Sequence, residues 1–137
     1  MKDRPIVLIV DDQPDNLYMY ANYLETEAPL GVITAMSGRE AVVKAKRFQP
    51  DVILLDLSMP QMDGYQVARE LAGDPATKNI PVILLSAYAS EAEAARALGQ
   101  SFASFVGSVA QGYVSKPCLP DVLLQHVRQV VPMAAAS

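Results

Sequence analysis

Residues 6–12 have the sequence IVLIVDD, in which five consecutive apolar side chains run directly into Asp11 and Asp12. A second apolar run, Val52 to Leu55, ends in the same way at Asp56. Continuous apolar runs of this length are typical of strands buried on both faces, as in parallel sheets covered by helices. Parallel strands end at one shared edge, where open α/β folds place their ligands. The sequence therefore predicts three carboxylates at one such edge.

Three carboxylates this close together would repel one another unless a hard cation lay between them, and oxygen ligands of this kind suit Mg²⁺. A third apolar run, residues 82–85, ends in Ser86. A fourth short one, Tyr113-Val114, leads within two residues to Lys116. The same edge is therefore expected to collect a hydroxyl and an amine, a combination that suits phosphoryl transfer to a carboxylate.

The composition bounds the class of protein. A chain of 137 residues is expected to form one domain with a sizeable core. Its net charge of −4 and its pI of about 4.8 argue against a partner such as nucleic acid, which requires a clustered basic face. No apolar stretch approaches the ~20 residues of a membrane span. The first residues lead into a strand without a signal-peptide core, so cytoplasmic residence is expected.

Strand-like and helix-like segments alternate five times, the pattern of a parallel α/β sheet. Strands are expected at about 5–10, 32–35, 51–56, 82–86 and 112–115. Helices are expected from Pro14 until before Pro29, from Ser37 to about 48, at 63–72 and at about 119–131. Between Ser90 and Gln111 the sequence predicts a helix, followed by either a second helical piece or an extension of the first.

Local patterns predict the helix ends and buried faces. Ser37 and Glu40 have the spacing of a capping box. Cys118, the single cysteine, allows no internal disulfide and is expected to be a small core residue. The apolar stripe of the first helix is assigned to Leu17, Leu24 and either Tyr20 or Ala21, and the buried face of the last helix to Val122, Leu123, Val127 and Val130. Four tyrosines are expected in the core or at its rim, namely Tyr18, Tyr20, Tyr23 and Tyr65.

Five separate features, each at a strand terminus, resemble the receiver domain of two-component response regulators. They are Asp11-Asp12, Asp56, the segment Met59–Gly64, Ser86-Ala87 and Lys116-Pro117. The resemblance covers essentially the whole chain. It implies a doubly wound, flavodoxin-like five-stranded parallel sheet in the order 2-1-3-4-5, with five helices and an extended segment before the fifth strand. It also implies a receiver domain over residues 1–132, followed by a tail at 133–137.

The resemblance implies a role for each residue around the acidic edge. Asp56 would be the phosphoacceptor, attacking phosphorus as an ionised carboxylate to form a 4-aspartylphosphate. Mg²⁺ would be bound by Asp12 and Asp56 directly, by Asp11 through water, and by the backbone carbonyl of Ser58. Lys116 would place a positive charge against a phosphoryl oxygen.

Signalling in such a domain requires an element with two arrangements. The Ser86 hydroxyl would donate to the phosphoryl group, and Tyr113 occupies the position of the family's switch aromatic. The expected output is repacking of the surface formed by helix four, strand five and helix five. Ala87 is the small neighbour of the switch hydroxyl, and Pro117 is expected to be cis.

Two positions at the rim of the site, Ser58 and Tyr88, would tune how readily water attacks the acyl phosphate. A Tyr88 ring could shield that bond and slow self-hydrolysis.

One region departs from the family pattern. Lys116 follows Ser86 by 30 positions, which is several more than receivers usually show. The excess falls within Gln100–Gln111. It is either a tolerated surface insertion or an altered partner or dimerisation surface.

The partners implied are a sensor histidine kinase or phosphotransfer protein and a downstream protein, with a homodimer left open. The chain is expected to be either a stand-alone receiver or a piece of a longer regulator. Simpler interpretations also exist: Asp11 and Asp12 as a helix N-cap, Ser86 as an ordinary strand-end hydroxyl, and Tyr113 as core packing.

Three other functions compete with a phosphoaccepting receiver. An aspartate-nucleophile phosphatase of the haloacid dehalogenase type needs a second aspartate where this chain has Ser58. A flavodoxin-like cofactor binder would need a phosphate-binding glycine motif that the sequence lacks. A degenerate receiver would act as a protein-binding module without accepting phosphate.

Overall fold

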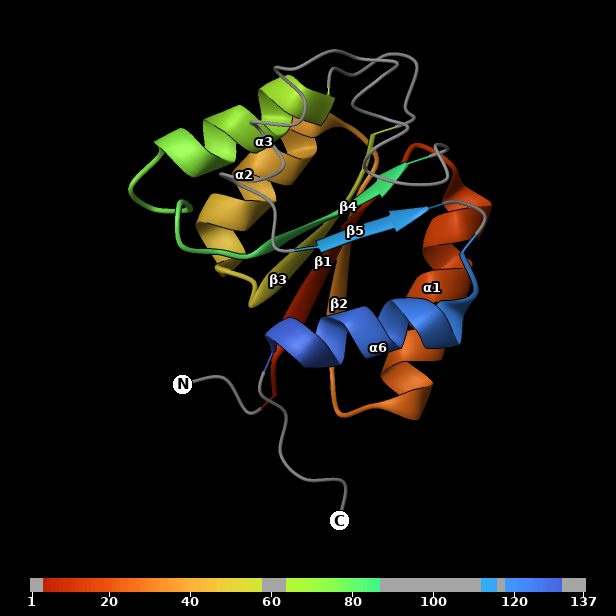
Figure 1. The fold of residues 1–137 in the computed structure, drawn as a ribbon. Coiled ribbons are helices and arrows are strands. Elements are labelled where there is room, and N and C mark those ends of the chain that lie inside the picture. The colour runs from red at the N-terminus through yellow and green to blue at the C-terminus, as the bar shows by residue number, and fades with distance from the viewer. Residues whose placement is uncertain (1–3, 58–63, 87–111, 116–117, 132–137) are drawn as a thin grey trace.

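The computed structural model describes residues 4–57, 64–86, 112–115 and 118–131, which form a three-layer α/β arrangement (Figure 1). Five strands make one sheet in the order β2-β1-β3-β4-β5, and every neighbouring pair is parallel. This confirms the predicted sheet and its strand order. The strands are β1 (Ile6–Val10), β2 (Gly31–Ala35), β3 (Val52–Asp56), β4 (Val82–Ser86) and β5 (Gly112–Ser115).

Helices cover both faces of the sheet. Among the described residues there are four, and they lie in pairs, with α1 and α6 against one face and α2 and α3 against the other (Figure 1). The expected helical segment from Ser90 to Gln111 lies outside the described residues. The four helices are α1 (Pro14–Glu27), α2 (Gly38–Phe48), α3 (Gly64–Gly73) and α6 (Pro120–Val130).

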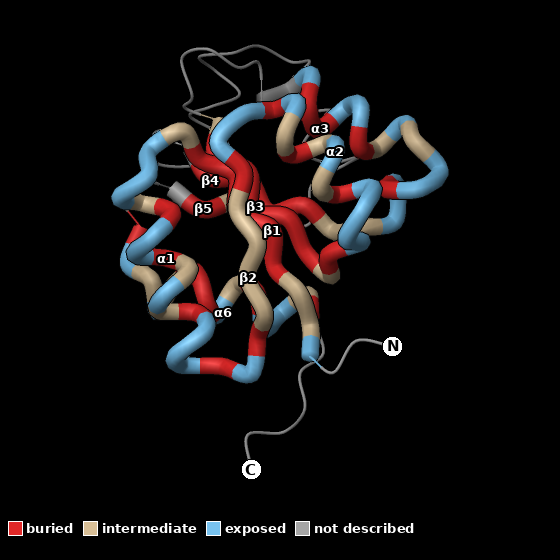
Figure 2. Tube along the Cα trace, turned by 180° about the vertical axis from the view of Figure 1, so that it is seen from behind, coloured by how far each residue is buried: buried red, intermediate tan, exposed pale blue. Residues whose placement is uncertain are grey.

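The central strand β3 divides the apolar interior into two cores. All five of its residues are buried (Figure 2). Because successive side chains of a strand point to opposite faces, Val52 and Leu54 join the core under α1 and α6, whereas Ile53 and Leu55 join the core under α2 and α3. This two-sided burial explains why the strand sequence is continuously apolar instead of alternating.

Helix α1 begins with Pro14 in its first turn, where the missing N–H leaves no hydrogen bond unmade. Its buried residues are Leu17, Tyr20 and Leu24, so the predicted stripe is confirmed with Tyr20 as its middle member. The expectation for Tyr18 is wrong, since 76% of this residue is exposed. One residue along a helix is a rotation of about 100°, which turns Tyr18 away from the face that carries Leu17.

Helix α2 begins with one half of the predicted capping box. The Ser37 hydroxyl accepts a hydrogen bond from the Glu40 N–H at 3.1 Å. The Glu40 carboxylate accepts from the N–H of Met36 at 2.7 Å, one residue before the capping serine, and forms an ion pair with Lys44 at 3.2 Å. The helix ends at Phe48, and the next residue, Gln49, caps it in the left-handed conformation with φ of 48°.

Helix α6 buries Leu123, Leu124 and Val127, while Val122 and Val130 are only partly buried at the margin of the same core. The predicted face was therefore correct in direction but omitted Leu124. Cys118, just before this helix, is buried in that core, as expected.

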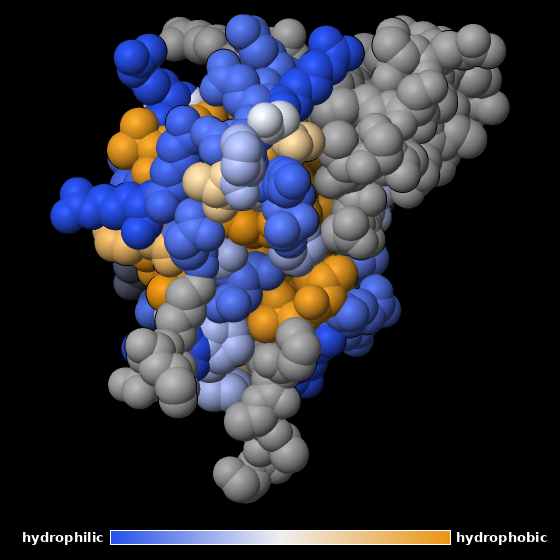
Figure 3. Space-filling view, turned by 90° about the vertical axis from the view of Figure 1, so that its left-hand side faces the viewer, coloured by the Kyte–Doolittle hydropathy of each residue, from blue (hydrophilic) through white to orange (hydrophobic). Residues whose placement is uncertain are grey.

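The exterior is mixed in polarity. Figure 3 shows one face on which hydrophilic side chains predominate and separate hydrophobic patches lie between them. Exposed apolar residues on scattered positions are ordinary in soluble domains. Within the part of the chain that the structure describes, no helix combines the length and apolar character needed to cross a bilayer.

Candidate phosphoacceptor and metal site

The three predicted carboxylates lie together at the carboxyl edge of the sheet. Asp11 follows β1 directly, Asp12 comes next, and Asp56 is the last residue of β3, the strand that pairs with β1. One ligand oxygen from each of the three lies within 4.8 Å of the others. Asp11 and Asp56 are each only 2% exposed, and Asp12 is half-buried. The geometric part of the sequence prediction is thus met.

Backbone hydrogen bonds fix the chain on either side of this cluster. The Asp11 N–H donates to the carbonyl of Ala35 at 3.1 Å, which extends the β1–β2 pairing by one residue. The Leu57 N–H donates to the carbonyl of Leu85 at 2.8 Å and extends the β3–β4 pairing past Asp56. The acidic residues therefore sit on backbone that the sheet holds in place.

The side chain of Asp11 is oriented by the start of α1. Its Oδ1 accepts a hydrogen bond from the N–H of Gln13 at 2.9 Å, and its Oδ2 accepts one from Nδ2 of Asn16 at 3.3 Å. Asn16 was not among the predicted site residues, although its place in the first turn of α1 brings it near the acidic pair. The N-cap interpretation finds partial support, because Asp11 bonds the helix entry while Gln13 occupies the cap position.

The donor set fits a small divalent cation. Like charges at 4.8 Å repel by about 3.5 kcal/mol per pair at an effective dielectric constant of 20, so three buried or half-buried carboxylates favour a positive charge among them. Around an octahedral Mg²⁺ with metal–oxygen distances of about 2.1 Å, adjacent ligand oxygens are about 3 Å apart and opposite ones about 4.2 Å apart. The oxygens of Asp11, Asp12 and Asp56 lie within 4.8 Å of one another, a spacing that allows direct binding of the ion by some of them and binding through water by others.

The structure describes only some of the other predicted site residues. Ser86 ends β4 and pairs in register with Ser115, the last residue of β5. Tyr113 pairs with Leu84, is half-buried and packs against the core under α2 and α3. Five other predicted site residues lie outside the described residues, namely Ser58, Ala87, Tyr88, Lys116 and Pro117.

One further residue near the site escaped the sequence prediction of function. The hydroxyl of Tyr20 donates a hydrogen bond to the backbone carbonyl of Cys118 at 3.0 Å. Burial raises the pKa of this hydroxyl to about 12, and the thiolate that Cys118 forms at high pH and the carboxylates of Asp11 and Asp56 act in the same direction. Burial of Tyr20 was readable from helical spacing, and a buried phenol needs a partner, but nothing in the sequence named that partner.

The comparisons with known proteins agree with this geometry. The family model described as the response regulator receiver domain matches residues 7–128. The response regulator PleD of Caulobacter vibrioides is 38% identical over 124 residues, which are 90% of this chain, and the chain spans only 25% of PleD. Protein PilH of Pseudomonas aeruginosa is 32% identical over 125 residues, which are 91% of this chain and 96% of PilH.

Solved structures give the same result. The chemotaxis response regulator CheY4 of Vibrio cholerae superimposes with a TM-score of 0.78 at 30% sequence identity, covering 93% of this chain and 98% of that one. The family model, the full-length likeness to PilH and the sheet order all point the same way. The chain belongs to the family of response regulator receiver domains, which are signalling domains.

Proposed function

We propose that this chain accepts a phosphoryl group on Asp56 from a phosphohistidine of a sensor kinase or phosphotransfer protein. The observation that carries the proposal is the cluster of Asp11, Asp12 and Asp56 at the end of adjacent strands, with ligand oxygens within 4.8 Å. Asp56 is the member that terminates the central strand, where both cores fix its backbone. An acceptor held this firmly needs little reorganisation before attack.

The chemistry is a displacement at phosphorus. One Asp56 oxygen forms the bond to phosphorus while the bond from phosphorus to the imidazole nitrogen breaks. The electron pair of that bond stays on the leaving nitrogen, which takes a proton from water. The product is a 4-aspartylphosphate.

The residues that would hold Mg²⁺ are Asp11, Asp12, Asp56 and the backbone carbonyl of Ser58. The bound ion supplies the positive charge that lets an anionic carboxylate approach an anionic phosphoryl group. Asp11, oriented by Gln13 and Asn16, keeps its place when the acceptor is modified.

Ser86 and Lys116 are assigned to the phosphoryl oxygens. The pairing of Ser86 with Ser115 supports this assignment, because it places the ends of β4 and β5 side by side and Lys116 follows Ser115 directly in the sequence. Lys116 would neutralise the added charge, and the Ser86 hydroxyl would donate to it. Tyr113, which starts half-buried, would change its packing in response and alter the surface around β5 for a downstream protein.

The role is signalling in the cytoplasm, not turnover of a substrate. The partners would be a sensor kinase, a downstream protein and, in a homodimer, a second copy of this chain. Ser58 and Tyr88 would lie at the rim of the site and set the lifetime of the acyl phosphate.

The test is incubation with acetyl phosphate and Mg²⁺ followed by intact-mass measurement. Wild-type protein should gain one phosphoryl group, and the gain should disappear in Asp56→Asn and in the presence of a chelator. Asp15→Asn is the matched control, because Asp15 is an exposed carboxylate in the first turn of α1 and lies outside the cluster. Its modification should equal that of wild type.

Other outcomes would reject the proposal. Continuous release of phosphate without a stable adduct would indicate a phosphatase. Absence of any reaction in wild-type protein would favour a protein-binding module. Retention of the adduct in Asp56→Asn would place the acceptor elsewhere.

A further inference from the structure

Strand β2 forms one open edge of the sheet, and α1 and α2 flank it on opposite faces (Figure 2). Its pairing with β1 turns the backbone groups of every second residue toward β1 and those of Val32 and Thr34 outward. The outward carbonyl of Thr34 accepts a hydrogen bond from Nζ of Lys44 on α2 at 2.6 Å. Because a lysine at a sheet edge hinders the addition of a further strand, a partner at this edge is expected to contact the two helices.

The outer surfaces of these helices carry most of the exposed large apolar side chains. The described part of the chain has six such residues, and five of them lie on α1, on α2 or just before α2. These five are Tyr18, Met19, Met36, Val43 and Phe48. Single exposed apolar residues are ordinary on a protein surface, but a concentration around one sheet edge indicates a contact surface.

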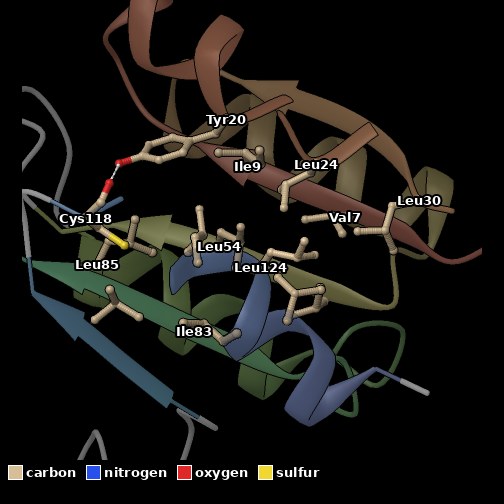
Figure 4. Packing of buried hydrophobic residues seen from close by; sticks show 14 of the residues in the cluster. Val7, Ile9, Tyr20, Leu24, Leu30, Leu54, Ile83, Leu85, Cys118 and Leu124 are labelled. Carbon is tan, nitrogen blue, oxygen red and sulfur yellow. Dashed lines mark hydrogen bonds between the residues drawn. The ribbon is translucent and has the colours of Figure 1, made fainter. Parts of the chain in front are cut away.

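One side of α1 is turned toward the open edge. The opposite side is marked by Tyr20, whose hydroxyl donates to the carbonyl of Cys118, just before α6, at 3.0 Å (Figure 4). Since α6 lies beside α1 on the same face and β2 is the outermost strand, the side of α1 away from α6 faces the edge (Figure 1). Tyr18 is two residues from Tyr20, a rotation of about 200°, and Glu25 lies seven residues beyond Tyr18 on nearly the same line. Tyr18 and Glu25 therefore face the open edge.

Helix α2 can be oriented in the same way. Its side toward α3 is marked by the ion pair of Lys46 with Asp74, which follows α3, at 3.0 Å. Its side toward β2 is marked by Lys44. Arg47 comes three residues after Lys44, which places it within about 60° of Lys44 around the helix and therefore beside the edge. The exposed stripe at four-residue spacing that ends there consists of Arg39, Val43 and Arg47.

The two helices carry opposite charge. Helix α1 contains three acidic residues and no lysine or arginine, so its formal charge is −3. Helix α2 contains four basic residues and one glutamate, so its formal charge is +3. Among the residues that the structure describes, the carboxylates of α1 form no ion pair, and neither do Arg39 and Arg47. Each helix therefore has charge to offer to a partner of the other sign.

This distribution of charge distinguishes two ways of placing a second copy at the edge. A two-fold axis perpendicular to the sheet would bring α1 against α1 and α2 against α2, so that charges of like sign would meet. A two-fold axis parallel to the strands exchanges the two faces of the sheet and brings α1 of each protomer against α2 of its partner. Both helices run away from the carboxyl edge of the sheet, so Glu25 near the end of α1 lies level with Arg47 near the end of α2.

We propose that α1, β2 and α2 form a dimerisation surface on which each α1 packs against α2 of a second copy of this chain. The inference goes beyond the proposed function, because it does not depend on phosphorylation of Asp56. Apolar contacts through Tyr18 and Val43 supply affinity, and the opposite charges set the orientation. Because the axis is parallel to the strands, the carboxyl edges of both protomers point the same way. The two acidic clusters then lie on one face of the dimer.

Sedimentation equilibrium of the full chain over a range of concentrations tests this surface. Wild type should dimerise reversibly, and its dissociation constant should rise as sodium chloride is added, since salt screens the charges. Glu25→Lys and Arg47→Glu should each raise the dissociation constant about tenfold, because either substitution creates a like-charge contact at both of the symmetric α1–α2 contacts. Tyr18→Ser should also weaken the dimer, through the loss of apolar contact.

Mixing the two charge variants is the sharpest measurement. An equimolar mixture of Glu25→Lys and Arg47→Glu should recover nearly the wild-type affinity. In the heterodimer, one α1–α2 contact has both charges reversed and the other keeps both wild-type charges. The matched controls are Glu70→Lys and Arg69→Glu, which reverse exposed charges on α3, away from the β2 edge, and should leave the dimer unchanged.

Several results would overturn the inference. One is a wild-type protein that stays monomeric at millimolar concentration. Another is a pair of charge variants that associate as wild type does, or that recover no affinity when mixed although their urea midpoints show that both are folded. Tighter dimerisation of Glu25→Lys would place α1 against α1 and reject the proposed geometry. If a charge variant failed to fold, Tyr18→Ser and the salt dependence of wild type would decide, and an unchanged dissociation constant in both would reject the surface.

Discussion

Replacing Asp56 by asparagine should make the protein more stable in the absence of divalent cations. The substitution keeps the size of the side chain and removes one of three negative charges whose ligand oxygens lie within 4.8 Å. At that distance each pair repels by about 0.9 kcal/mol at the dielectric constant of water and by about 3.5 kcal/mol at an effective value of 20. Two of the three pairs involve Asp56, so the substitution removes between about 2 and 7 kcal/mol of electrostatic repulsion.

The measured gain in the free energy of unfolding should lie near the lower of these two values. Asp12 is half-exposed and is therefore screened by solvent, and the Asp56 carboxylate also makes other interactions that asparagine would weaken. We expect the free energy of unfolding to rise by about 1–3 kcal/mol at low ionic strength. The gain should shrink as salt is added, because screening reduces the repulsion that the substitution removes.

The assay is urea unfolding with a chelator and again with Mg²⁺. A ligand that binds only the folded state at 100 times its dissociation constant stabilises it by about 2.7 kcal/mol. The free energy of unfolding of wild type should rise by such an amount when Mg²⁺ is added. That of Asp56→Asn should rise clearly less at the same Mg²⁺ concentration. Asp15→Asn should leave the increment unchanged while losing a few tenths of a kcal/mol, because it removes a charge that favours the N-terminus of α1.

Two results would refute the reasoning. One is an Asp56→Asn protein that is less stable than wild type in chelator. The other is an Asp56→Asn protein that Mg²⁺ stabilises as much as it stabilises wild type, since the three carboxylates would then not form the cation site.

Three further predictions concern the fold. Ser37→Ala should lower the free energy of unfolding by about 1 kcal/mol, because the Glu40 N–H loses its capping acceptor; an unchanged urea midpoint would contradict this. The N–H of Met36 and then Lys44 lower the pKa of Glu40 from 4.5, so its contribution is present above that pH and is lost as the pH falls through the lowered value. Glu40→Gln should therefore cost on the order of 0.5 kcal/mol at pH 7, and this cost should shrink as the pH falls below 4.5, which unfolding measured across that pH range would check. Leu54→Ala, at a fully buried position of β3, should cost about 3 kcal/mol in the same assay, and a cost below about 1 kcal/mol would show that the core collapses around the gap.

The sheet and its acidic edge were predictable because their signals are local in sequence. An apolar run that ends in aspartate specifies both a buried strand and the place where that strand leaves the core. The strand order came from family resemblance, and the structure confirms it. Asp11, Asp12 and Asp56 meet because β1 and β3 pair directly, which strand order alone implies.

The errors and omissions concern side chains whose burial or hydrogen bonding depends on how the helices pack in the folded protein. Tyr18 and Tyr20 differ by one helical step, and only the direction in which α1 faces the sheet separates an exposed ring from a buried one. Leu124 is buried in the core under α1 and α6, and the contact between these two helices has no signature in the sequence of either one. The hydrogen bond from Tyr20 to Cys118 depends on the same docking and could not be read from segments 98 residues apart.

The location of Asp56 on β3 has a mechanical consequence. A strand with partners along both sides and apolar packing on both faces cannot shift without loosening the whole interior at once. Extra charge placed at its tip must therefore be accommodated by neighbouring groups that move toward it, while the acceptor itself stays still. We therefore expect the central strand to keep its position while the groups around its end rearrange, so that the response is carried toward the surface around β5.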